Sequence, residues 1–71
     1  MSFSDRIIQL KNERKLLQKD IASSIGLSLR ANQYYEKGQK QPTLSVLLRL
    51  ADYFDVSLDY LVGRSDDPTR H

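Results

Sequence analysis

The stretch that decides the fold runs over residues 18–38 and reads QKDIASSIGLSLRANQYYEKG. Its apolar residues follow the spacing of one face of an α-helix, and the pattern is interrupted at Gly26. Glycine adopts the left-handed conformation that ends a helix without a steric penalty, and Ser28 is a favourable N-cap for a following helix. We therefore predict one helix over about 18–25 and a second over about 28–37.

The connection between these two helices consists of Gly26-Leu27-Ser28. A connection this short, with glycine at its start, forces a sharp angle between the helices, which is the helix-turn-helix arrangement. The second helix of such a pair can lie in the major groove of DNA, because that groove is wide enough to admit an α-helix. The stretch therefore predicts a helix that can reach base edges.

The flanking sequence continues in short segments of helical spacing. We expect a first helix that begins after Ser4 as its N-cap, with Phe3 packed on Ile8. A fourth helix is expected after Thr43 and a short fifth helix after Ser57, since both residues are good caps. The apolar residues that these patterns place in the core are Ile7, Leu10, Ile21, Ala22, Ile25, Leu44, Leu47, Leu48, Ala51 and Phe54.

No segment alternates apolar and polar residues with a period of two, so we predict no sheet. The expected fold class is all-α, a compact arrangement of five helices with the helix-turn-helix formed by the second and third. A chain of 71 residues is long enough for one domain. We expect this domain to cover residues 1–63, which Gly63 closes, and residues 64–71 to form a flexible C-terminal tail.

Composition excludes several classes of function. The chain has no cysteine, which excludes a metal site built on thiolates. Its one histidine, His71, is the last residue, and no neighbouring residue could orient it as a catalytic base. No paired carboxylates, nucleophile with a base, or glycine-rich phosphate loop is present, so we expect no enzyme activity and no cofactor, metal or small-molecule ligand. No apolar run approaches membrane-spanning length and the first residues lack a signal-peptide pattern, which favours a cytoplasmic protein without a membrane partner.

The charges are distributed unevenly although the net charge is only +2. Residues 6–43 contain eight lysines and arginines against three acids, whereas residues 44–71 contain three arginines against five aspartates. A basic half opposite an acidic half is typical of a protein with one surface for a polyanion. A mixed solvated surface is the alternative that charge alone leaves open.

Read as a whole, the chain resembles the lambda-repressor-like, Cro-type (Xre) helix-turn-helix regulators of bacteria and phages. The resemblance covers nearly everything over residues 6–66. It implies a five-helix domain that binds double-stranded DNA as a sequence-specific transcriptional regulator, a repressor of the phage or mobile-element type. The matching residues are Arg6-Ile7, Leu10, Gln18, Ile21-Ala22, Ile25-Gly26-Leu27-Ser28, Tyr35-Glu36-Lys37-Gly38, Pro42, Leu44, Leu47, Leu50-Ala51, Phe54 and the run from Val56 to Ser65.

The resemblance also implies which residues contact DNA. Helix N-termini offer free N–H groups to phosphate oxygens, and arginine, glutamine and leucine can pair with guanine, adenine and the thymine methyl group respectively. The phosphate contacts implied are Gln18, Ser28 and the loop residue Lys40. The base contacts implied are Leu29, Arg30, Gln33 and Tyr34, although Tyr34 stands where the family often has a polar or basic residue.

Two departures from the family pattern concern the same two helices. Leu17 stands where the family usually has a serine or threonine N-cap, which should cost about 1 kcal/mol of helix stability. Asn32 stands at a position that is usually apolar, so its side chain must find hydrogen-bond partners or turn toward the DNA. Tyr35 is expected in the core, and Lys11 and Glu36 resemble a family ion pair between the first and third helices.

The short fifth helix carries more apolar surface than it can bury alone, and we expect part of it to form a homodimer interface through Leu58, Leu61 and Val62. A dimer would read a palindromic operator with half-sites about one helical turn apart. Two other functions are compatible with the fold. One is an antitoxin that binds a toxin partner as well as DNA, and the other is a protein adaptor that has lost DNA binding.

Overall fold

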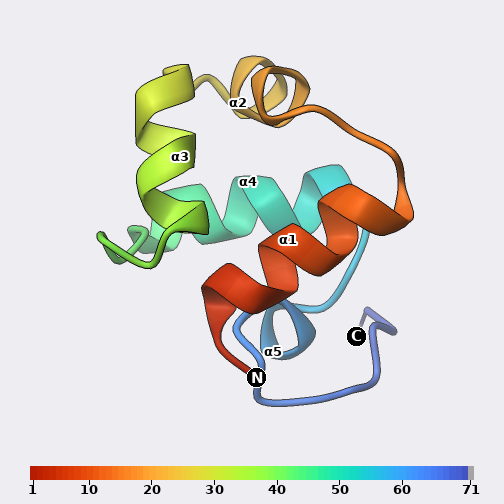
Figure 1. The fold of residues 1–71 in the computed structure, drawn as a ribbon. Helices are drawn as coiled ribbons and strands as arrows, with labels where there is room; N and C mark the ends of the chain where they lie inside the picture. The colour runs from red at the N-terminus through yellow and green to blue at the C-terminus, as the bar shows by residue number, and fades with distance from the viewer. Residues whose placement is uncertain (71) are drawn as a thin grey trace.

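The structure, a computed structural model, describes residues 1–70, and these form five α-helices without a strand (Figure 1). The predicted all-α, five-helix fold is therefore confirmed. The helices are α1 (Phe3–Glu13), α2 (Gln18–Ile25), α3 (Leu29–Glu36), α4 (Leu44–Phe54) and α5 (Leu58–Leu61).

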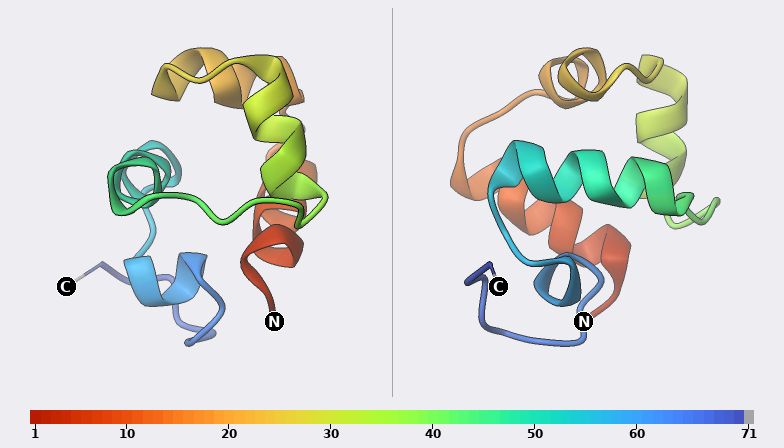
Figure 2. Two further views of the ribbon diagram at one scale, coloured as in Figure 1. Left: turned by 90° about the vertical axis from the view of Figure 1, so that its left-hand side faces the viewer. Right: turned by 180° about the vertical axis from the view of Figure 1, so that it is seen from behind.

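The five helices pack around one core. Helix α2 contacts both α3 and α4, while α1 contacts α3 and α5. Figure 1 shows α2 and α3 at one end of the molecule, and α5 with both chain ends at the other. Turned views in Figure 2 show that α4 crosses the middle of the molecule between these two ends, where it contacts α2 and α5. The buried apolar residues are Ile7, Leu10, Ile21, Ala22, Ile25, Val46, Leu50, Ala51, Phe54, Val56, Tyr60 and Leu61.

Helix α4 corrects the predicted core. We expected Leu44, Leu47, Leu48, Ala51 and Phe54 to face inward, but Leu44 is 63% exposed and Leu48 is 49% exposed. Ala51 and Phe54 are buried as predicted and Leu47 packs against the core, while the other buried residues of α4 are Val46 and Leu50. Because α4 has leucine or valine at five of its first seven positions, its periodicity is compatible with more than one inward face. Packing against α2 and α5 selects the face that starts at Val46.

The start of α1 also differs from the prediction. The N-cap is Ser2, whose Oγ accepts the Asp5 N–H at 3.1 Å, and the helix begins at Phe3 rather than after Ser4. The acidic residue in the first turn is favoured there by the helix dipole. Phe3 is consequently inside the helix, and its ring meets that of Tyr35 edge to face with centroids 6.3 Å apart. Tyr35 packs against the core as expected.

Residues 64–70 lie against the body of the domain. The Ser57 N–H donates to the Pro68 carbonyl oxygen at 2.9 Å, and the Arg70 guanidinium is 2.7 Å from the Asp52 carboxylate. The domain boundary after Gly63 and the flexibility of the tail stay predictions, and His71 lies outside the described residues.

Candidate nucleic-acid interface

The turn between α2 and α3 forms as predicted. Gly26 has a φ of +75°, in the left-handed region, and the Leu27 N–H donates to the Ala22 carbonyl oxygen at 2.8 Å. Ser28 then caps α3, because its Oγ accepts the Ala31 N–H at 3.1 Å. These local bonds set the sharp change of direction between the two helices, which is visible in Figure 2. They place the N-terminal turns of α2 and α3 close to each other.

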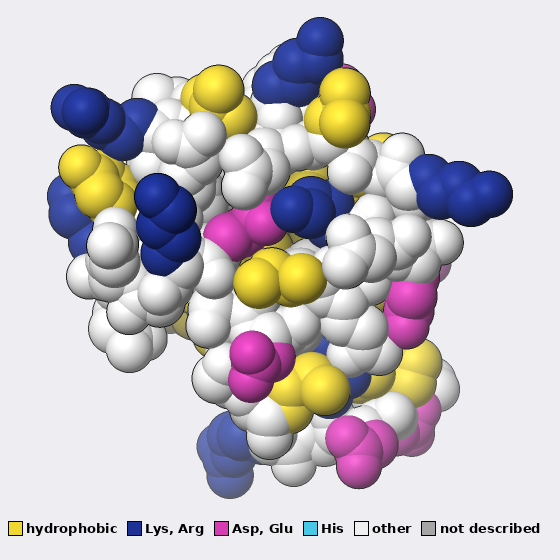
Figure 3. All heavy atoms as spheres, viewed as in Figure 1, with side chains coloured by type: hydrophobic (Ala, Val, Ile, Leu, Met, Phe, Trp, Pro, Cys, Tyr) yellow, Lys and Arg dark blue, Asp and Glu magenta, His cyan; other side chains and the backbone are white. Residues whose placement is uncertain are grey.

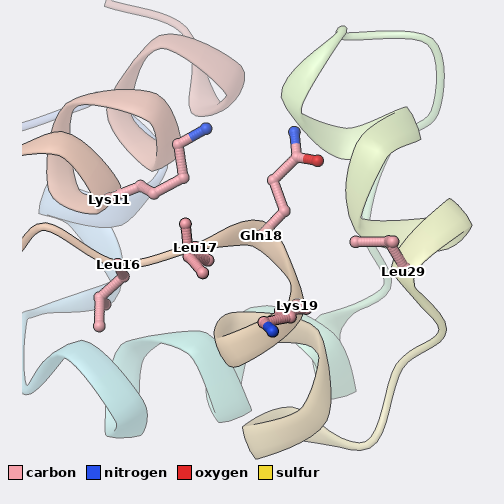
Figure 4. Close-up of a pocket in the computed structure, with 6 residues that line it drawn as sticks. All are labelled: Lys11, Leu16, Leu17, Gln18, Lys19 and Leu29. Atoms are coloured by element: carbon pink, nitrogen blue, oxygen red, sulfur yellow. The ribbon is translucent and has the colours of Figure 1, made fainter.

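The first turn of α3 is open to solvent. Ser28, Leu29 and Arg30 are exposed, while Gln33 and Tyr34 further along the helix are half-buried. Leu29 lines a shallow pocket together with Gln18 of α2, and the two side chains face this opening from opposite helices (Figure 4). The other lining residues are Lys11, Leu16, Leu17 and Lys19. The structure therefore brings the candidate phosphate contact Gln18 beside the candidate base contacts on α3.

Gln18 and Gln33 contact each other directly. The Gln33 Nε2 donates to the Gln18 Oε1 at 3.3 Å, across 15 residues of sequence. Each amide keeps further donor and acceptor capacity after this bond, because a glutamine side chain carries two N–H donors and two acceptor lone pairs. Gln18, which the resemblance assigns to phosphate contact, is thus hydrogen-bonded to Gln33, which it assigns to base contact.

Asn32 is directed inward and finds its partners there. Its side chain is 1% exposed, and Nδ2 donates to the Gln18 carbonyl oxygen at 3.3 Å and to the Glu36 Oε2 at 3.0 Å. Glu36 also accepts from the Lys11 Nζ at 2.7 Å, so the expected ion pair between α1 and α3 is confirmed. Among the described residues, no buried side-chain nitrogen or oxygen lacks a hydrogen-bond partner.

Leu17 caps α2 without a side-chain hydrogen bond, as its residue type requires, and it is 57% exposed. The Asp20 carboxylate partly compensates for the missing cap, because its Oδ2 accepts the Leu17 N–H at 3.1 Å. Lys40, in the loop after α3, lies with its Nζ 4.6 Å from the centre of the Tyr34 ring. This cation–π contact keeps the predicted phosphate contact Lys40 next to the predicted base contact Tyr34.

Charge is distributed along the axis from the α2–α3 end to the α5 end. In Figure 3 most lysine and arginine side chains lie over the half of the view that contains α2 and α3, and most acidic side chains lie toward α5. The basic surface predicted from the sequence therefore coincides with the open first turn of α3. Such a surface attracts phosphates before any base contact forms.

The residues predicted for a dimer interface separate in the structure. Leu61 is 0% exposed and packs in the core of its own chain, so it is not available to a second copy, which corrects that part of the prediction. Leu58 and Val62 are partly exposed. Leu58 shares a shallow groove with Leu48 of α4 and Val56.

Sequence reasoning missed the exposed leucines of α4, which lie on one side of the helix four residues apart. Their only sequence signal was the surplus of apolar residues in α4. It also missed Arg6, which is 3% exposed and whose Nε donates to the Tyr60 carbonyl oxygen at 2.8 Å.

In the part of the chain that the structure describes, no cluster of three or more His, Cys, Asp or Glu side chains could hold a metal ion. Across the same residues, the helices are all too short or too polar to cross a lipid bilayer.

Comparison with known proteins gives concordant results. A family model described as Helix-turn-helix matches residues 7–61. The chain is 38% identical over 66 residues to YobD, an uncharacterized HTH-type transcriptional regulator of Bacillus subtilis, covering 93% of this chain and 59% of the relative. It is 39% identical over 59 residues to the cryptic phage CTXphi transcriptional repressor RstR of Vibrio cholerae, covering 79% of this chain and 53% of that repressor. The chain spans little more than half the length of these relatives.

Two solved structures have the same fold. One is a transcriptional regulator from Listeria innocua, with a TM-score of 0.83 and 37% identity, covering 87% of this chain and 58% of that one. The other is the P22 c2 repressor in complex with a synthetic operator, with a TM-score of 0.84 and 25% identity, covering 92% of this chain and 98% of that one. The resemblance noted from the sequence is confirmed by these matches.

Proposed function

The chain belongs to the helix-turn-helix family of lambda-repressor-like domains, and from this premise we propose that it is a sequence-specific transcriptional regulator of the repressor type that binds double-stranded DNA. The observation that carries this proposal is the open first turn of α3 beside the N-terminus of α2, on the basic end of the molecule. The relatives named as a phage repressor and as a repressor bound to an operator support the same function.

Helix α3 carries the residues that contact the edges of the bases. Arg30 is exposed and carries the planar pair of donors that matches the O6 and N7 acceptors of guanine. Gln33 retains one N–H and its carbonyl oxygen for the edge of adenine after bonding to Gln18. Leu29 is 45% exposed and offers an apolar surface to a thymine methyl group, and Tyr34 completes the set of residues on this face.

The residues that contact phosphates lie at the N-termini of α2 and α3 and in the loop after α3. Gln18 begins α2, where free N–H groups and the helix dipole favour an anion. The Ser28 hydroxyl accepts from Ala31 but keeps its own hydrogen to donate to a phosphate oxygen. Lys40 adds a charge whose contribution depends on salt concentration. These contacts position the protein on the duplex and leave sequence discrimination to α3.

The regulator acts as a homodimer on a palindromic operator, because two recognition helices on adjacent half-sites give more sequence specificity than a single domain of this size. The residues proposed for dimerisation are Leu44, Leu48, Leu58 and Val62, which are exposed or half-buried. A second copy of this chain is the proposed occupant of the groove between Leu48 and Leu58. Such a regulator works in the bacterial cytoplasm, where its operator lies.

The test is selection of binding sites from a random duplex pool, followed by affinity measurements for the winning site over a salt series. A short palindromic site whose preference persists at about 0.15 M salt is the expected result. Binding that enriches no sequence and disappears with added salt would reduce the interaction to phosphate attraction and overturn the proposal. Arg30→Ala should weaken the preference for the selected site. Arg64→Ala is its matched control, because Arg64 is exposed near the α5 end.

A further inference from the structure

We propose that Asn32 is a positioning residue for DNA recognition, which sets the placement of Gln18 relative to the base-reading face of α3. Asn32 itself cannot contact a base, since it is 1% exposed and its amide is bonded to Gln18 and Glu36. Asn32 acts on DNA recognition through Gln18, whose main-chain oxygen accepts a hydrogen bond from its amide. This inference rests on the proposed function, because it concerns how the same surface acquires its geometry.

Two consecutive residues of α3 hold the one residue that begins α2. Asn32 Nδ2 donates to the main-chain oxygen of Gln18, and Gln33 Nε2 donates to the side-chain oxygen of Gln18. Both bonds are partly buried. Together they restrain both the backbone of the first turn of α2 and the direction of the Gln18 side chain.

The Asn32 amide also makes a buried hydrogen bond on its other side. Asn32 also donates to Glu36 Oε2 at 3.0 Å, and Glu36 Oε1 accepts from Lys11 Nζ at 2.7 Å. The Asn32 amide is therefore held between the α2 backbone and an ion pair that joins α1 to α3. A buried polar network whose members all have partners restrains geometry more narrowly than apolar contact, which tolerates sliding.

An apolar residue at this position would leave the Gln18 carbonyl oxygen and Glu36 Oε2 without the donor that the Asn32 amide supplies. Removing one partner of a buried hydrogen bond lowers stability, because the remaining acceptor is kept from water. A positioning role is therefore distinguished from a structural one by the discrimination between operator and unrelated DNA, which a general loss of stability does not change.

The experiment compares Asn32→Leu with the wild-type chain on the selected operator and on a scrambled duplex of equal length. We expect affinity for the operator to fall at least about ten-fold while affinity for the scrambled duplex changes less than about two-fold. The thermal midpoint of the variant is expected to fall, because two acceptors lose their donor. Ile7→Ala is the control for lost stability, because Ile7 is buried in α1 and takes no part in the α2–α3 joint.

A second variant tests the ion pair beyond Asn32. Glu36→Gln removes the charge paired with Lys11 but keeps a side-chain oxygen that can accept from Asn32, so discrimination between operator and scrambled duplex should persist. Unchanged discrimination in Asn32→Leu would overturn the proposal. So would a parallel loss of affinity for both duplexes, if Ile7→Ala shows the same loss at a similar thermal midpoint. A wild-type chain that selects no site would remove the proposed function and this inference with it.

A measurement on the wild-type chain covers the case in which Asn32→Leu does not fold. Hydrogen exchange of side-chain amides, followed by NMR without DNA, should show protection of the Asn32 amide relative to those of the exposed residues Gln39 and Gln41. Exchange of the Asn32 amide as fast as at these exposed positions would contradict the bonds on which the proposal depends. Asn32→Ser then gives the binding comparison with a smaller side chain.

Discussion

The Arg6 guanidinium lies over the ring of Tyr60 at 3.7 Å from its centroid, and its Nε donates to the main-chain oxygen of the same residue at 2.8 Å. Its NH2 donates to the Ser65 carbonyl oxygen at 3.1 Å. One buried side chain of α1 therefore holds both α5 and the segment that follows it. Arginine suits this position because its planar donors can serve several acceptors in fixed directions.

Arg6→Met should lower the free energy of unfolding by about 2–4 kcal/mol, because the carbonyl oxygens it serves lose a charged donor inside the protein. Urea unfolding measures this loss. Arg64→Met is the control, since Arg64 is exposed and its replacement should change the free energy by less than about 0.5 kcal/mol. Equal effects of the two substitutions would show that the contacts of Arg6 add nothing to stability.

Arg30→Ala should relax sequence preference at one base pair of each half-site. The expected loss of discrimination is about ten-fold or more at that position, with little change in the affinity for unrelated DNA. Repeating the site selection with the variant reveals which base is affected. Uniform weakening at every position would assign Arg30 to phosphate contact instead.

Lys40→Ala should weaken binding to all sequences alike. Because each neutralised phosphate releases counterions, the slope of log affinity against log salt should become shallower by about 0.9 for each subunit bound. Arg64→Ala is the control, as Arg64 is exposed near the α5 end. An unchanged slope for Lys40→Ala would indicate that this lysine contacts only the Tyr34 ring.

Leu48→Asp should shift the chain from dimer to monomer, because it places a charge in the apolar surface proposed for self-association. Analytical ultracentrifugation over a concentration series measures the change, with an expected rise in the dissociation constant of at least about ten-fold. Asn12→Asp adds a carboxylate to an exposed position of α1 and should leave association unaffected. A wild-type chain that stays monomeric throughout, on and off DNA, would contradict the dimer.

Gly63→Ala should destabilise the fold more than Gly26→Ala. Both glycines have positive φ, which costs an alanine about 1 kcal/mol. A Cβ at Gly63 would also clash with the Met1 carbonyl oxygen, whereas at Gly26 the nearest atom is 3.8 Å away. Urea unfolding of both variants tests the difference. Equal losses would mean that the first residue moves aside without cost.

Local signals account for the parts of the fold that were predicted correctly. The caps Ser28, Thr43 and Ser57 were assigned from sequence and each accepts the expected backbone N–H. Gly26 ended α2 for a reason that lies within a few residues of it. Ser2 was missed because Ser4 offered an equally good local signal, and only the structure shows which serine accepts the bond.

The sequence by itself determined the five helices, the helix-turn-helix joint and the polar face of α3, because helix periodicity and capping act between residues that are near neighbours in the chain. Tertiary structure decided which face of α4 is buried, since its apolar residues permit more than one choice until α2 and α5 pack against it. It also decided the partners of the buried polar groups. Asn32 reaches Gln18 across 14 residues and Arg6 reaches Tyr60 across 54, and contacts at such separations depend on how the helices pack.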